Sequence, residues 1–89
     1  MKAIVTVTGR DKTGIIARVS AALSAYGVNI LDISQTVLQE YFAMIMLVDI
    51  SGSKLPFAEL SDKLSETARD ICMDIRVMRE EIFDAMHRI

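Results

Sequence analysis

Tryptophan is absent from this sequence, and aromatic residues make up only 6% of its 89 residues. Cysteine and histidine occur once each, as Cys72 and His87. A single cysteine cannot form a disulfide framework, which favours a reducing compartment and a cytoplasmic protein. A lone histidine without a second histidine or a cysteine pair does not make a metal site. We expect His87 to be a surface residue and the protein to hold no metal or cofactor.

A surplus of one charge is also lacking, because ten basic and twelve acidic residues give a net charge of −2. No basic footprint for nucleic acid and no polybasic anchor stand out. No apolar stretch reaches the roughly 20 residues of a membrane-spanning helix, and the apolar run after Lys2 is too short for a signal peptide. We therefore expect no nucleic-acid partner and no membrane partner.

Hydrophobic residues, in contrast, are abundant at 52% of the chain, above the globular average of about 45–50%. A chain of this length forms one domain, which buries only about 60–65% of the surface that its unfolded form exposes. The apolar surplus indicates that some of it is buried against another chain. We expect a homo-oligomer, at least a dimer.

Hydrophobic periodicity divides the chain into strands and helices. The predicted strands cover 3–8, 29–38, 41–50 and 73–78, and the predicted helices cover 15–26 and 57–71. Right-handed crossovers place both helices on one face of an antiparallel sheet. The fold class is α+β, a ferredoxin-like βαββαβ sandwich with a four-stranded antiparallel sheet, two helices on one face and a short C-terminal helix.

Two segments carry more apolar side chains than this fold needs. The strand over 41–50 is apolar on both faces, whereas a strand with one wet face should alternate with polar residues. Segment 80–89 forms an amphipathic helical extension to the domain over 1–79, and we expect it to pack on the open sheet face of its own chain or of its partner. Its apolar stripe consists of Ile82, Phe83, Met86 and Ile89.

No catalytic set emerges from the spacing of reactive residues. Gly9 and Gly14 have the spacing of a phosphate-binding loop, but Ile15 and Ile16 stand where its Lys and Ser or Thr belong. The aspartates are scattered, and Cys72 in its apolar setting is expected to be a small core residue. We expect a protein that is not an enzyme.

The junction between the first strand and the first helix is the candidate binding place. A helix N-terminus attracts anions through unpaired N–H groups, and Gly14 would let a ligand approach the backbone. Asp11 or Thr13 can cap this helix, and Gly27 ends it in a left-handed conformation. On composition alone, the favoured interpretation is that Asp11 and Gly14 serve only turn geometry and capping.

The segment Asp11-Lys12-Thr13-Gly14-Ile15-Ile16, followed by Val19, Leu23 and Gly27-Val28-Asn29-Ile30, resembles the signature of the ACT domain family. In that family a βαββαβ unit binds amino acids or related metabolites and regulates enzymes or transcription. Thr13 departs from the family's usual Pro. The resemblance covers 1–79 and looks closest to stand-alone single-ACT proteins, which are also similar to the N-terminal part of the glycine-cleavage-system transcriptional repressor.

The resemblance implies a ligand site between subunits, where the helix-one loop of one chain faces the start of strand two of another. Backbone N–H groups near Gly14 suit a carboxylate, and the Asn29 amide offers a donor and an acceptor. The implied function is amino-acid sensing, exerted through assembly or through a partner enzyme or regulator. The implied ligand-binding residues are Asp11, Gly14, Ile15, Asn29 and Ile30.

Other functions on this fold make different demands on the sequence. A structural or interaction module with a vestigial ligand site remains the alternative. An acylphosphatase on the same fold needs an arginine in a glycine-rich cradle with a partner asparagine, and Arg10 and Asn29 lack that context. RNA binding on this sheet relies on stacking aromatics on central strands, and the first strand has none.

Overall fold

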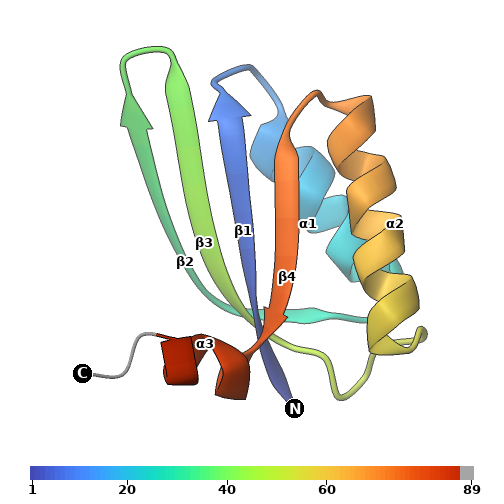
Figure 1. The fold of residues 1–89 in the computed structure, drawn as a ribbon. Coiled ribbons are helices and arrows are strands. Elements are labelled where there is room, and N and C mark those ends of the chain that lie inside the picture. The colour runs from blue at the N-terminus through green and yellow to red at the C-terminus, as the bar shows by residue number, and fades with distance from the viewer. Residues whose placement is uncertain (87–89) are drawn as a thin grey trace.

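The computed structural model describes residues 1–86, with the backbone alone for Met86, as a sheet with two long helices on one face (Figure 1). The predicted His87 surface site and the predicted place of Ile89 lie outside the described residues. The sheet is antiparallel with the order β2-β3-β1-β4, as the βαββαβ prediction requires. The elements are β1 (Lys2–Arg10), α1 (Ile15–Ala25), β2 (Asn29–Leu38), β3 (Tyr41–Asp49), α2 (Phe57–Asp70), β4 (Asp74–Arg79) and α3 (Glu80–Met86).

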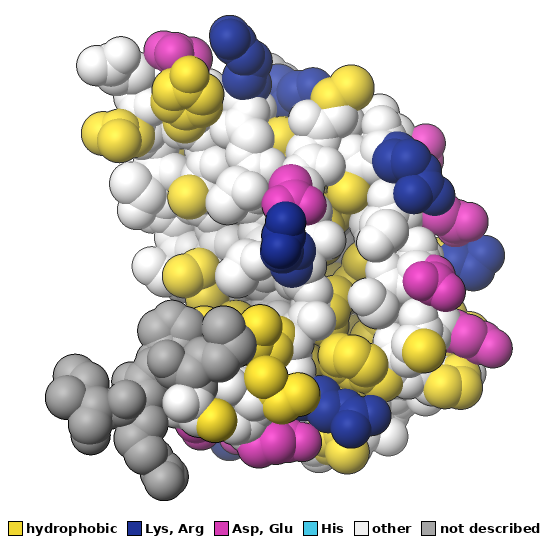
Figure 2. Space-filling model, in the orientation of Figure 1, with side chains coloured by type: hydrophobic (Ala, Val, Ile, Leu, Met, Phe, Trp, Pro, Cys, Tyr) yellow, Lys and Arg dark blue, Asp and Glu magenta, His cyan; other side chains and the backbone are white. Residues whose placement is uncertain are grey.

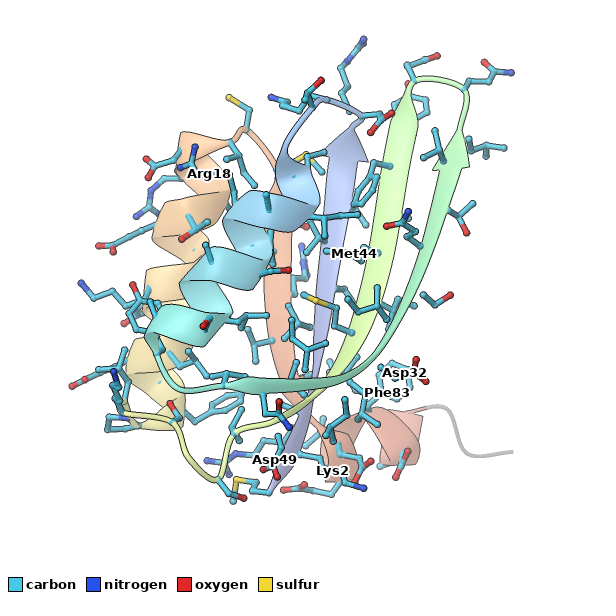
Figure 3. All side chains as sticks on the ribbon, turned by 180° about the vertical axis from the view of Figure 1, so that it is seen from behind. Lys2, Arg18, Asp32, Met44, Asp49 and Phe83 are labelled. Atoms are coloured by element: carbon cyan, nitrogen blue, oxygen red, sulfur yellow. The ribbon has the colours of Figure 1, made fainter. Side chains whose placement is uncertain are left out.

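The core lies between the sheet and the two long helices, where Figure 3 shows Met44 pointing from β3 towards α1. Alternation along β1 and β3 buries one face of each strand, and helical spacing buries one stripe of α1 and of α2, as predicted. The buried side chains include Ala3, Val5, Val7, Phe42, Met44, Met46, Val48, Val19, Leu23, Leu60 and Leu64.

The start of α1 differs from the prediction that Asp11 or Thr13 caps it. Gly14 is the N-cap, with a left-handed φ of +88° and no side-chain hydrogen bond at the cap. Its carbonyl oxygen accepts the N–H of Arg18 at 3.0 Å. The left-handed conformation selects glycine, and it replaces the side-chain cap that the acidic and hydroxyl residues suggested.

Cys72 is not the core residue that its apolar neighbours predicted. It is exposed in the turn between α2 and β4, with a φ of +55°. Ile71 and Met73 on either side of it are buried. The turn directs two apolar anchors inward and the thiol between them outward, which hydrophobicity alone does not indicate.

Strand β2 extends beyond the layer of helices, so that every residue from 31 to 38 is exposed. A register irregularity between Ile30 and Asp32 leaves Leu31 without a partner in β3. Leu31 therefore does not continue the single face predicted for Leu31, Ile33 and Val37. Beyond it, Ile33, Gln35 and Val37 stand opposite the buried residues of β3 and share the helix side of the sheet.

The sheet face away from α1 and α2, here called the open face, is covered only at its lower end. There α3 crosses the sheet beside β1 and β4 (Figure 1). Ile4 and Phe83 line one hollow beneath it, and Ile4 is only 9% exposed although it belongs to the open face. The prediction that the C-terminal segment packs on the open face holds within one chain for the described part of α3.

Candidate functional site

The loop over 11–14 connects β1 to α1 at the upper end of the sheet in Figure 1. The backbone N–H of Asp11 donates to the carbonyl oxygen of Glu40 at 2.7 Å, which ties the loop to the β2–β3 turn. All four loop residues are exposed. The loop therefore forms a rim that this hydrogen bond fixes in place. Its backbone is open to solvent, and it lies next to the positive end of the α1 dipole.

A hollow of about 230 Å³, here called the loop hollow, lies between this rim and β2. Asp11, Gly14 and Ile15 line it from the loop and α1, while Gln35 and Val37 line it from the helix side of β2. The hollow exists because the helices stop short of β2. It brings together three of the five predicted ligand-binding residues.

A second hollow, of about 200 Å³, lies on the other side of the loop and is more polar. Lys12 and Arg18 line it beside Gly14, with Asp70 from α2 opposite. The Arg18 guanidinium is 4.0 Å from the Asp70 carboxylate, and both side chains are more than half exposed. Such an exposed pair contributes little to stability, so Arg18 is available to an anion near the start of α1.

Asn29 and Ile30, the other two predicted residues, lie at the opposite end of the sheet. Asn29 stands opposite Asp49 in β3, whereas Leu38 at the far end of β2 stands opposite Tyr41. Asn29 and Leu38 are nine positions apart along an extended strand, or about 30 Å. Within one chain, the predicted site is therefore split into two halves.

The lower half carries a carboxylate with a perturbed titration. The backbone N–H and the hydroxyl of Ser51 hold the pKa of the Asp49 carboxyl below its ordinary value, with a smaller contribution from the amino group of Met1. The Ser51 N–H donates to Asp49 Oδ1 at 2.9 Å, and the Met1 nitrogen lies 3.6 Å from the same oxygen. Figure 3 shows Asp49 at the end of the sheet remote from Arg18.

Sequence reasoning missed Gln35 and Val37 as lining residues of the loop hollow. Their side of the sheet depends on the irregularity at Leu31, which shifts the alternation of β2 by one residue. The sequence does contain a signal for this assignment. The short turn at Gln39 and Glu40 sets the register between β2 and β3, so the alternating burial along β3 determines on which side of the sheet Val37 lies. Strand pairing, rather than β2 alone, would have assigned both residues.

Among the described residues, no three side chains of His, Cys, Asp or Glu gather where they could hold a metal ion. None of the helices in that part of the chain has the length and apolar content that crossing a bilayer demands. The polar groups near the loop are backbone N–H groups, the cations of Lys12 and Arg18, the carboxylates of Asp11 and Asp70 and the amide of Gln35, which are means of binding a small polar molecule.

Comparison with known sequences gives consistent matches. The sequence model of the ACT domain matches residues 2–78. The UPF0237 protein of Clostridium acetobutylicum is 49% identical over 89 residues, which is all of both chains. The UPF0237 protein of Methanocaldococcus jannaschii is 47% identical over 88 residues, covering 99% of this chain and 98% of that protein.

Solved structures share the fold. An ACT domain protein from Streptococcus pneumoniae superposes with a TM-score of 0.83 at 44% identity, over 98% of each chain. A putative glycine cleavage system transcriptional repressor gives 0.74 at 21% identity, over 88% of this chain and 44% of that one. The regulatory subunit of aspartate kinase from Thermus thermophilus gives 0.69 at 24%, over 89% and 51%. The last two likenesses show the fold alone, but with the matched family model and the full-length relatives they leave one assignment: this chain belongs to the ACT domain family.

Proposed function

We propose that this protein is a regulatory sensor that binds an amino acid or a related metabolite between two copies of the chain. ACT domains are typically regulatory ligand-binding modules, which supports a binding role rather than an enzymatic one. The observation that carries the proposal is the loop hollow, where Gly14 and Ile15 face the helix side of β2. It lies beside β2, the edge strand at which a partner would arrive.

The loop side of this hollow suits a carboxylate. The first N–H groups of α1 have no partner within the helix, and the helix dipole adds partial positive charge there. Lys12 and Arg18 add two exposed cations near the same turn. The amide of Gln35 supplies a donor and an acceptor from β2.

The second half of the site is proposed to come from a partner chain. Strand β2 is a sheet edge with exposed apolar side chains, and edges of that kind are normally covered or paired. Antiparallel pairing of two β2 strands would put Asn29 and Ile30 of one chain beside the Leu38 end of the other. The loop of that other chain lies at the same end, so the five predicted residues would meet.

The regulatory output would follow from this arrangement. A ligand held between two chains stabilises the pair, so its concentration would control assembly or the contact with a partner enzyme or regulator. We propose a cytoplasmic location, because the exposed thiol of Cys72 suits reducing conditions.

A thermal-denaturation panel of amino acids on the purified protein tests the proposal. A ligand that binds only the folded assembly at a hundredfold excess over its dissociation constant should stabilise it by about 2.7 kcal/mol. We expect one amino acid or a small group of similar ones to raise the melting temperature. If none binds at millimolar concentration, the amino-acid proposal is wrong.

The second candidate function is an interaction module whose ligand site is vestigial. The exposed apolar residues of β2 favour it, since Leu31, Val37 and Leu38 offer more contact surface than a small ligand needs. This candidate predicts oligomers of unchanged stability across the whole amino-acid panel.

A further inference from the structure

The upper half of the open face carries an apolar surface that the proposed edge pairing does not use. It is formed by Leu38, Tyr41, Ala43 and Ile45, here called the exposed stripe, whose three larger side chains are 69%, 53% and 48% exposed. A hollow of about 320 Å³ is lined by Leu38, Tyr41 and Ala43 together with Thr8 and Thr36. Figure 2 shows hydrophobic side chains on this side of the face, above the part that α3 covers.

The opposite end of the same face carries a second unused surface, on α3. Ile82 is half exposed, while Phe83 lines the hollow on its own sheet with Ile4 and Ile45. The acids of α3 form no ion pair within the described residues. These acids are Glu80, Glu81 and Asp84. With Phe83 towards the sheet, helical spacing puts Glu81 and Ala85 on the outward side of α3, with Ile82 on one flank and Asp84 on the other.

A two-fold axis lying in the plane of the open face, across the strands, would bring these two surfaces together. It places the upper half of one copy over the lower half of the other, so each contact occurs twice. We propose that a second copy of this chain covers the open face, with α3 of each copy resting on the exposed stripe of the other. This contact goes beyond the proposed function, since it does not use the loop hollow and shares only Leu38 with the β2 edge.

The charges of the two surfaces complement each other. Alternation along β1 puts Arg10 on the open face, level with Tyr41, and it forms no ion pair within the described residues. Asp74 on the same half is already paired with Arg76 at 3.0 Å. Arg10 is therefore the charge that would meet the acidic side of the partner's α3.

The size of the face is also sufficient. Four strands at a spacing of about 4.8 Å give the face a width of about 19 Å, and strands of nine residues give it a length of about 30 Å. A stable interface buries about 800 Å² on each partner, which the strands and the outward side of α3 would supply together. The polar residues of β2 and β4 on either side of the stripe, such as Ser34 and Arg76, give the polar rim that interfaces have.

Disulfide trapping tests this contact directly. Ala43→Cys and Ile82→Cys are combined with Cys72→Ser in the full chain. Ala43 is level with Thr8, whereas α3 lies over Ile4, four residues lower on β1, or about 13 Å away. A disulfide bridges Cα atoms no more than about 7 Å apart, so the two introduced thiols of one chain cannot pair with each other without moving α3.

We expect mild oxidation to give a disulfide-linked dimer, and we expect a reductant to cleave this disulfide. The matched control replaces Ile82→Cys with Ala58→Cys, which puts an equally exposed thiol on α2. Dimer yield from the Ala43→Cys/Ile82→Cys protein well above that of the control supports the proposal. An equal or lower yield overturns it.

Light scattering on Ile82→Asp gives a second readout. The acid should break the face contact and lower the mass, while an amino acid that stabilises the parent should still stabilise the variant. An unchanged mass overturns the face contact and leaves the ligand proposal standing. A lowered mass in a protein that no amino acid stabilises keeps the face contact and counts against the ligand proposal.

Discussion

The backbone of Asp11 donates a hydrogen bond to the carbonyl oxygen of Glu40 at 2.7 Å, across the upper end of the sheet. Through this contact the loop before α1 and the β2–β3 turn form one edge. The two residues are 29 positions apart in the sequence, yet the loop hollow depends on them being neighbours. Asp11, Gly14 and Ile15, three of the predicted ligand-binding residues, are therefore held at a fixed position relative to β2.

Two left-handed glycines should respond differently to the same substitution. Gly14 and Gly27 have φ values of +88° and +78°, so alanine at either costs about 1–2 kcal/mol in backbone strain. A Cβ at Gly14 would have no atom within 4 Å, whereas at Gly27 it would lie 2.6 Å from the carbonyl oxygen of Gly52. We expect Gly27→Ala to lower the free energy of unfolding clearly more than Gly14→Ala, measured by urea titration. Equal losses would show that the Gly52 contact relaxes at no cost.

Most of the fold follows from short-range patterns in the sequence. Alternation along β1 and β3 gave the correct buried faces because each strand is regular and pairs on both sides. Val19, Leu23 and Leu64 are buried because they follow helical spacing against one flat sheet, whereas Ile16, which the same spacing also assigns to the stripe of α1, is 38% exposed.

The errors share one cause, which is a local backbone conformation that side-chain type does not reveal. Cys72 points outward because a positive φ turns it, and the cap of α1 is a left-handed glycine rather than Asp11. The irregularity at Leu31 removes this residue from the face that Ile33 and Val37 share as predicted. The prediction that the two halves of the site come from different chains rested on the family resemblance. The number of residues between Gly14 and Asn29 does not give the distance between them in space.

A cavity in the core should cost far more than the loss of an exposed apolar side chain. Leu64 of α2 is fully buried, and removing such a leucine side chain costs about 2–5 kcal/mol. Leu38 is mostly exposed in the single chain, so Leu38→Ala should leave the unfolding of dilute, dissociated protein almost unchanged. We expect Leu38→Ala instead to weaken assembly, measured by sedimentation over a concentration series. A large loss in the dilute Leu38→Ala protein would contradict the exposure seen in the structure.

Acid should remove a contribution that Asp49 makes to stability. Its carboxyl pKa is lowered in the folded chain by the hydrogen bonds of Ser51, so ionised Asp49 favours the folded state. This contribution is present above the ordinary aspartate pKa of about 3.9 and is lost as the pH falls through the lowered value. We expect Asp49→Asn to be less stable than the parent at pH 7 and to converge with it below pH 3, by chemical denaturation.

Asp62→Asn is the matched control for that titration. It removes an exposed carboxylate of α2 that takes part in no ion pair within the described residues. A stability difference from the parent that stays constant from pH 7 to pH 3 in Asp49→Asn would contradict the role given to Ser51.

The division of the ligand site between two chains can be tested by mixing two defective variants. Gly14→Val puts a branched side chain at the loop, and Asn29→Ala removes an amide worth about 0.5–1.5 kcal/mol for each hydrogen bond. Each homodimer should bind the best amino acid of the panel poorly. In a mixed dimer, the intact loop of one chain meets the intact Asn29 of the other, so one site of two is complete.

Random mixing makes about half of the dimers mixed, so calorimetry should recover about a quarter of the parent's binding sites at the parent's affinity. Gly14→Asn serves as the control for backbone strain, because asparagine tolerates the left-handed conformation better than valine does. If the mixture binds no better than the two variants alone, Gly14 and Asn29 do not act across a chain boundary. Full parent-like binding by either variant alone would instead move the ligand away from that residue.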